Sequence, residues 1–264
     1  MKYTVLSLFP EIADSFFAAS IMAKAVNRGI LAYQSVNIRD FARDRHHTCD
    51  DAPYGGGAGM LMLAEPLGLA LESVGVRRKP APPAAAGEGL RRKRVINLSP
   101  SGRPFNQDLA RELAQEEELV LLCGRYEGID QRIIDLYVDE EISVGDYVLS
   151  SGEVAALAVI DATYRLVDSV IKAESLEEES FSGNLLEYPQ YTRPEVYDTL
   201  RVPEILLSGH HENIRRWRLQ KQVEKTLALR PDLIRAGEEK GLFDKETAQI
   251  IAELRGQNER DQSD

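Results

Sequence analysis

Short apolar runs alternate with amphipathic stretches along the first two thirds of this 264-residue chain. The apolar runs have the length of strands and lie at Tyr3–Phe9, Leu31–Val36, Val95–Leu98, Leu119–Cys123 and Tyr147–Leu149. Apolar residues at helical spacing occur in Glu11–Asn27, Ala64–Val74, Gln107–Glu117, Asp130–Tyr137 and Val154–Tyr164. Strands that alternate with helices predict an α/β domain with a mainly parallel sheet.

This alternation of apolar runs and amphipathic stretches ends near residue 168. Acidic and small residues replace it from Asp168 to Gly183, a change that is typical of a linker. Beyond it, Glu212–Leu229 predicts a long basic helix, and Pro231–Arg255 predicts two shorter ones. We therefore predict an α/β domain over residues 1–167, a flexible linker over 168–183 and a small, mostly helical domain over 184–264. The Pro-, Ala- and Gly-rich segment Arg77–Arg94 is expected to be a surface insertion.

Composition excludes several classes of protein. No run of 18 or more apolar residues is present, so we expect no membrane partner. The first residues lack the long apolar region of a signal peptide, and Cys49 and Cys123 imply no disulfide framework, which favours the cytoplasm. The net charge of −11 argues against a protein that coats nucleic acid without specificity, and no DNA partner is expected.

Basic residues are nevertheless concentrated in three clusters. They are Arg39, Arg43 and Arg45; then Arg77, Arg78 and Lys79 with Arg91, Arg92, Lys93 and Arg94; and finally Arg215, Arg216, Arg218, Lys221 and Lys225. One such cluster alone is typical of a solvated surface. Three of them are compatible with an RNA enzyme whose cations lie on one face.

The loop Tyr54–Met62, with the sequence YGGGAGMLM, carries the most glycine. It does not fit a dinucleotide fingerprint, because Met62 stands where a third small residue is needed and no strand precedes the loop. Glycines before a helix can still bring backbone amides close to a phosphate or a ribose.

Three further glycine-bearing segments lie in the predicted sheet domain: Leu98–Gly102, Cys123–Asp130 and Ser143–Gly152. The first two follow predicted strands directly, and ligands of open α/β sheets bind outside the carboxyl ends of strands. Glycine exposes backbone N–H and C=O groups to a planar ring such as adenine. We therefore predict that these segments share one pocket.

No metal site is predicted from the residues themselves. His46, His47 and Cys49 lack a fourth ligand at zinc-site spacing. His210 and His211 precede Glu212 without forming the HExxH motif.

Several long blocks resemble the bacterial tRNA (guanine-37, N1)-methyltransferases, which belong to the SPOUT class. The blocks are SLFPE (Ser7–Glu11), RDFARDRHHTCDDAPYGGGAGMLM (Arg39–Met62), LSPSG, CGRYEGID, SVGDYVLSSGE, SFSGNLLEYPQYTRPE (Ser180–Glu195) and VPEILLSGHHENIRRWR (Val202–Arg218). The resemblance implies a deep trefoil knot in the sheet domain, which general topology rules would not predict. It also implies S-adenosylmethionine as methyl donor, an assisting divalent cation such as magnesium, the tRNA anticodon arm as partner, and a homodimer.

The same resemblance assigns site residues. The donor pocket would comprise Leu98, Pro100, Gly124, Tyr126, Glu127, Val144, Gly145, Tyr147, Leu149 and Gly152. The tRNA would contact Asp50, Gly59, Glu187, Arg193, Arg215 and Arg218. Two positions depart from the family pattern, because Ser151 replaces a usual glycine and Ala155 a usual proline.

Methyl transfer to guanine N1 needs a base and a cation. N1 carries a proton that must leave, and negative charge then builds on O6, where a cationic donor stabilises the transition state. The resemblance assigns the base to Glu179, where the family usually has aspartate, and the cation to Arg165. Glu177 and Glu178 are alternatives for the base. Without the resemblance, Glu179 would be interpreted as part of a solvated linker and Arg165 as a contact at a helix end.

Two other functions stay open at this point. One is a knotted RNA-binding protein with weak or lost catalysis, an alternative that is compatible with the departures from the family pattern at Glu179, Ser151 and Ala155. The other is a methyltransferase that acts on a ribose 2′-hydroxyl.

Overall fold

The computed structural model describes residues 1–79, 93–171 and 179–261. The chain divides into two compact units, Met1–Ile171 and Lys172–Asp264. The boundary between them lies within the stretch 168–183 where the composition changes. Most of the expected insertion Arg77–Arg94 lies outside the described residues.

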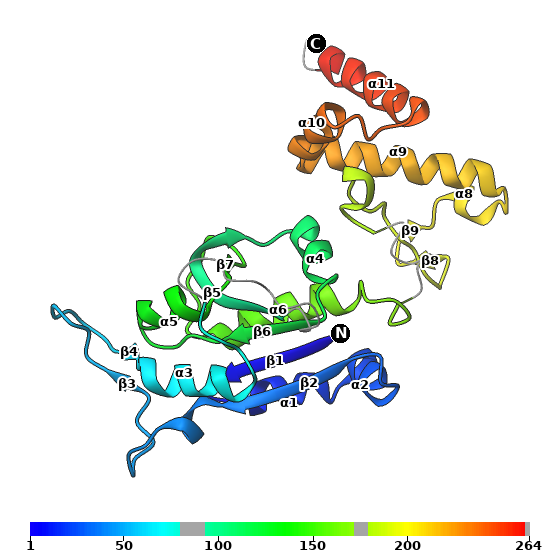
Figure 1. Cartoon of the computed structure of the whole chain (residues 1–264). Helices are drawn as coiled ribbons and strands as arrows, with labels where there is room; N and C mark the ends of the chain where they lie inside the picture. Colours follow the sequence, from blue (N-terminus) through cyan, green and yellow to red (C-terminus); the bar gives the residue numbers. More distant parts are fainter. Residues whose placement is uncertain (80–92, 172–178, 262–264) are drawn as a thin grey trace. The chain divides into compact units, whose positions relative to one another are not determined.

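A five-stranded sheet forms the centre of the first unit (Figure 1). Its strands are β1 (Lys2–Ser7), β2 (Ala32–Asn37), β5 (Lys93–Pro104), β6 (Glu118–Leu122) and β7 (Glu140–Ser143), in the order β2-β1-β6-β5-β7. Every neighbouring pair is parallel. This confirms the predicted α/β class with a mainly parallel sheet. A short antiparallel pair, β3 (Asp50–Asp51) and β4 (Leu61–Met62), flanks the glycine-rich loop.

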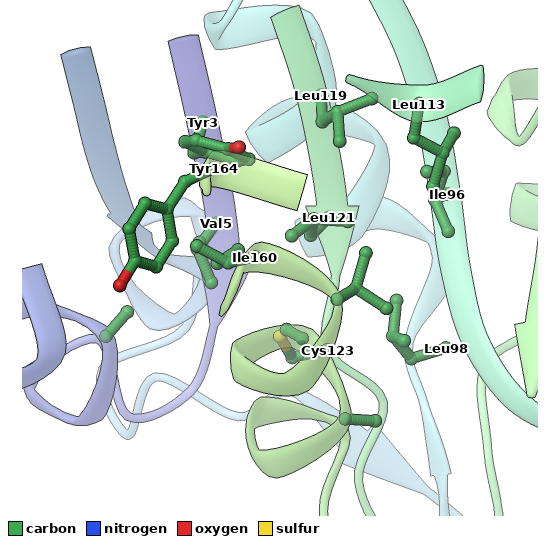
Figure 2. Packing of buried hydrophobic residues seen from close by; sticks show 14 of the residues in the cluster. Tyr3, Val5, Ile96, Leu98, Leu113, Leu119, Leu121, Cys123, Ile160 and Tyr164 are labelled. Carbon is green, nitrogen blue, oxygen red and sulfur yellow. The ribbon is translucent and has the colours of Figure 1, made fainter. Parts of the chain in front are cut away.

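Helices cover both faces of this sheet because its inner strands are apolar on both sides. One face packs against α1 (Glu11–Phe17), α2 (Ser20–Asn27), α4 (Gln107–Leu113) and α6 (Gly152–Tyr164). The other packs against η1 (Ile38–Phe41), α3 (Ala64–Ser73) and α5 (Gln131–Tyr137). Figure 2 shows the first core, in which Tyr3 and Val5 of β1 meet Ile160 and Tyr164 of α6.

Two predictions about local structure are wrong. The single helix expected over Glu11–Asn27 is broken at Ala19, which is extended. The buried residues Phe17 and Met22 are five apart, and an unbroken helix would turn Met22 about 140° away from the sheet. Tyr147–Leu149 is an exposed segment instead of a strand, and the strand lies earlier, at β7.

The second unit is built mainly from helices. They are α8 (Glu204–Leu207), α9 (His211–Leu229), α10 (Pro231–Glu239) and α11 (Lys245–Asp261), preceded by η2 (Ser182–Asn184) and the hairpin of β8 (Val196–Tyr197) and β9 (Leu200–Arg201). Its core consists of Leu185, Val223, Ile234, Ile250 and Ile251. Trp217 of α9 is half-buried beside Tyr191, with ring centroids 6.5 Å apart.

Candidate functional site

A cavity of about 360 Å³ lies at the carboxyl ends of β5, β6 and β7. Most of its lining comes from the three glycine-bearing segments. Leu98–Gly102 lies within β5, at the irregularity in its pairing with β7, and the other two segments lie at the carboxyl ends of β6 and β7. It includes all ten residues that the resemblance assigns to the donor pocket: Leu98, Pro100, Gly124, Tyr126, Glu127, Val144, Gly145, Tyr147, Leu149 and Gly152. Its size falls in the range of pockets for small molecules.

Backbone-to-backbone contacts hold the cavity walls together. The Gly152 N–H donates to the Gly124 carbonyl at 2.8 Å, and a Cβ on Gly152 would lie 2.7 Å from the Gly124 nitrogen. On the other side, Ile142 of β7 pairs with both Leu98 and Arg103 of β5. Gly102 between them has no room for a Cβ against the backbone of β7. Glycine is therefore required at 102 and 152 because two chain segments pass within contact of each other.

The loop after β6 forms the wall that carries Tyr126 and Glu127. Tyr126 is left-handed, with a φ of 58°, which is uncommon for a residue other than glycine. The loop is tied to β4 and its neighbours: Glu127 N–H donates to Met60 O at 3.0 Å, and Met62 N–H donates to Gly128 O at 2.9 Å. Sequence reasoning gave Met60 and Met62 no role, because the contact joins segments more than sixty residues apart.

The same wall brings together residues from two assigned sets. Gly59, assigned to tRNA, has a φ of 86°, and a Cβ there would overlap the side chain of Glu127, assigned to the donor pocket. Asp50 lies on β3, directly opposite Met62 of β4. The glycine-rich loop and the cavity therefore share one structural element.

The two residues assigned to catalysis lie in different units. Arg165 forms the carboxyl-terminal cap of α6 in the first unit. Glu179 is half-buried in the second, where its carbonyl accepts the Ser182 N–H at 3.1 Å. Their joint action stays a prediction, and the alternatives Glu177 and Glu178 lie outside the described residues.

Ordinary interactions hold several of the other assigned residues. Arg215 forms ion pairs at 2.7 Å with both Glu212 and Glu246, and hydrogen bonds to these carboxylates raise the pKa of its guanidinium. Lys225 donates to the Glu187 carbonyl at 3.0 Å. Arg215 is thus engaged within its own unit, although sequence reasoning assigned it to RNA.

Arg193 and Arg218 line a second cavity, of about 580 Å³, within the second unit. The guanidinium of Arg218 lies over the Tyr188 ring at 4.7 Å from its centroid. Aromatic rings and guanidinium planes are the surfaces on which unpaired RNA bases stack. Arg215 does not belong to this lining.

Part of the second basic cluster contributes to folding. Lys93 lies 3.2 Å from Glu118, Arg94 lies 2.6 Å from Glu112, and Arg94 also pairs with Glu140. These ion pairs account for cations that the sequence alone grouped with a basic face.

Two further sequence observations concern metal ligation and the departure from the family pattern at Ser151. Within residues 1–79, 93–171 and 179–261, no group of three or more His, Cys, Asp or Glu side chains is arranged to hold a metal ion. Ser151 is extended, with a φ of −160°, so its replacement of glycine creates no backbone strain. No helix in the described part of the chain is both long and apolar enough to cross a membrane.

An open parallel sheet with a glycine-lined cavity at its carboxyl edge is typical of an enzyme that binds a nucleotide or nucleoside. The chain belongs to the tRNA (Guanine-1)-methyltransferase TrmD family, whose model matches residues 1–236. This confirms the resemblance drawn from the sequence blocks.

Relatives with this name are similar over nearly their whole length. The tRNA (guanine-N(1)-)-methyltransferase of Treponema denticola is 61% identical over 96% of this chain and 99% of its own. The protein of the same name from Treponema pallidum is 56% identical over 96% of both chains. That from Borreliella burgdorferi is 57% identical over 88% of this chain and 92% of its own.

Proposed function

We propose that this protein transfers a methyl group from S-adenosylmethionine to N1 of guanine 37, next to the anticodon, in a subset of tRNAs. The observation that carries the proposal is the single cavity that gathers all ten residues assigned to the donor pocket. Family membership and relatives named for guanine-N1 methylation support the same reaction.

The cavity fits the donor by its chemistry. Leu98, Val144 and Leu149 provide apolar contacts, while Gly124, Gly145 and Gly152 bring the backbone close enough to bind an adenine edge. The carboxylate of Glu127 complements the positive charge of the donor. When bound, the donor supplies an electrophilic methyl group on a sulfonium.

The protein's own residues would then move one proton and stabilise one charge. Glu179 accepts the N1 proton of guanine, and Arg165 donates to O6 as negative charge develops there. Arg165 ends α6, about 20 Å along the helix from the lining residue Gly152, and Glu179 belongs to the other unit. The proposed site therefore forms when other parts of an assembly bring these two side chains to the cavity. We propose that the assembly includes a second copy of the chain.

Exposed apolar residues beside the cavity support a homodimer. Val148, at the edge of the cavity lining, is 87% exposed, and Val154, which lies between the lining residues Gly152 and Ala155, is 55% exposed. A surface of this kind is normally covered by a partner. We expect Val154→Glu, at a position outside the lining, to convert a dimer into monomers in sedimentation analysis and to lower methyl transfer.

A trefoil knot and an assisting magnesium ion complete the proposal. The close backbone approaches of Gly102 to β7 and of Gly152 to Gly124 support chain threading of this type. Magnesium commonly uses one or two carboxylates with water and phosphate. The described residues form no three-ligand cluster, so we propose that RNA and water provide most of its ligands.

A labelled-methyl assay tests the activity. We expect label on a tRNA transcript with guanine 37 and none on its adenine 37 counterpart. Donor binding without transfer would favour the RNA-binding alternative, and label on the sugar would favour a ribose methyltransferase.

Two variants test the assigned residues. Glu179→Gln should lower transfer by about 10²- to 10⁴-fold and leave donor affinity unchanged. Glu239→Gln, on an exposed side chain of α10 that lines neither cavity, should retain activity. Leu149→Arg places a cation at the partly exposed edge of the cavity and should abolish donor binding in a folded protein. Substantial turnover in Glu179→Gln would show that another group is the base.

A further inference from the structure

A buried carboxylate lies directly behind the cavity wall. Glu153 follows Gly152 at the start of α6 and is 1% exposed. Its Oε1 accepts a hydrogen bond from the Ser7 hydroxyl at 2.5 Å, and its Oε2 lies 3.4 Å from Nε of Arg125. Three motifs that are distant in sequence therefore meet at this carboxylate.

Burial of this charge is costly unless it is paired. Arg125 is the cation that pairs with it, and the Arg125 guanidinium also packs over the Phe9 ring at 4.4 Å from its centroid. Among the described residues, Glu153 Oε2 and Arg125 Nε are both buried and have no hydrogen bond. Each atom therefore depends on the other for electrostatic compensation.

Arg125 itself lines the cavity, and the lining residues Tyr126 and Glu127 follow it directly. Tyr126 is left-handed, a conformation that is unfavourable for a residue other than glycine and persists only where neighbours enforce it. Arg125 supplies that constraint through two contacts. Its backbone N–H donates to Met62 Sδ at 3.2 Å, and its side chain is paired with Glu153.

We infer that Glu153 is a positioning residue for the methyl-donor site. Its carboxylate fixes Arg125 and thereby the placement of Tyr126 and Glu127, and Ser7 orients the carboxylate. This inference rests on the proposed function, since it requires that the cavity binds the donor.

The chain offers a matched control at the opposite ends of β1 and β6. Glu118 is also buried, accepts from Thr4 of β1 at 2.8 Å, and lies 3.1 Å from Lys2 and 3.2 Å from Lys93. It has the same chemistry as Glu153, with a hydroxyl and cations as partners, but it does not border the cavity. Loss of either carboxylate removes a buried ion pair, whereas only Glu153 contacts the loop that carries lining residues.

The experiment compares Glu153→Gln with Glu118→Gln in the full-length protein. S-adenosylmethionine affinity is measured by calorimetry, thermal unfolding by circular dichroism, and KM for donor and for tRNA by methyl transfer. Glu153→Gln should raise the donor Kd and donor KM about tenfold and leave the tRNA KM unchanged. Glu118→Gln should lower the unfolding temperature and retain wild-type donor affinity.

Ser7→Ala is a milder variant that keeps the carboxylate and should weaken donor binding about threefold. Wild-type affinity in folded Glu153→Gln, or equal loss in Glu118→Gln, would overturn the inference. If Glu153→Gln does not fold, wild-type affinity in Ser7→Ala alone overturns it. Leu149→Arg separates the two proposals: retained donor binding in that variant overturns the pocket itself, whereas its loss with retained binding in Glu153→Gln overturns only the positioning role.

Discussion

Replacement of Gly152 by alanine tests whether the cavity depends on two chain segments in direct backbone contact. A Cβ at this position would lie 2.7 Å from the Gly124 nitrogen and 2.8 Å from the Cys123 Cα, about 0.7 Å inside the 3.4 Å at which ordinary contact begins. Both neighbours are backbone atoms next to β6, so neither can rotate away. We expect a loss of about 1–3 kcal/mol from overpacking, offset by up to about 1 kcal/mol of helix propensity at the start of α6.

Gly124→Ala is the matched control, because it makes the same chemical change on the facing segment. Its Cβ would meet only the Ile129 side chain, at 3.6 Å, which is ordinary contact. Urea denaturation followed by circular dichroism should therefore give a free energy of unfolding about 1–2 kcal/mol lower for Gly152→Ala and nearly unchanged for Gly124→Ala. Wild-type stability in Gly152→Ala, or equal losses in both variants, would refute the reasoning.

Two other predictions concern ionisable groups in the first unit. Burial pushes the pKa of Glu118 upward, but hydrogen bonds from Thr4, Lys2 and Lys93 outweigh it and hold the pKa below its ordinary value. The stabilisation that Glu118 provides should be complete above the ordinary carboxyl pKa of about 4.3 and should disappear as the pH falls through the lower pKa of the folded state. Glu118→Gln should therefore flatten the acid side of a pH–stability profile, and an unchanged profile would contradict this. Burial raises the pKa of the Cys49 and Cys123 thiols, so native protein at about pH 8 should resist iodoacetamide, as mass spectrometry would show, and rapid native labelling of Cys123 would contradict its burial.

The central strands were predictable because their physical cause is local. A strand buried on both faces tends to be continuously apolar, as β6 is over Leu119–Leu122, and β1 approaches this pattern with only the small polar residues Thr4 and Ser7 among its buried positions. The strand β7 escaped prediction because two of its four residues are Glu140 and Glu141. Arg103 of β5 pairs with Glu140 at 3.2 Å, and Asn97 of β5 donates to Glu141 at 2.8 Å. These partners are about 40 residues away in the sequence, so local patterns do not reveal them.

The lining of the cavity was also predictable from local sequence, whereas the residues behind the lining were not. Glycine-bearing turns after strands mark a ligand edge in any open α/β sheet. The Ser7–Glu153 bond joins residues 146 positions apart, so no periodicity or spacing reveals it. Tyr147–Leu149 was wrongly predicted as a strand, because an apolar run that lines a cavity has the same composition as a short strand.

The position of β1 in the sheet has a consequence for synthesis on the ribosome. One edge of β1 pairs with β2, which ends at Asn37, but its other edge pairs Lys2 with Glu118 of β6. At about 5–20 residues per second, on the order of ten seconds pass before that second partner is made. During this interval the nascent chain exposes an apolar strand edge, and we expect holding chaperones to bind it most strongly until residue 122 has left the exit tunnel.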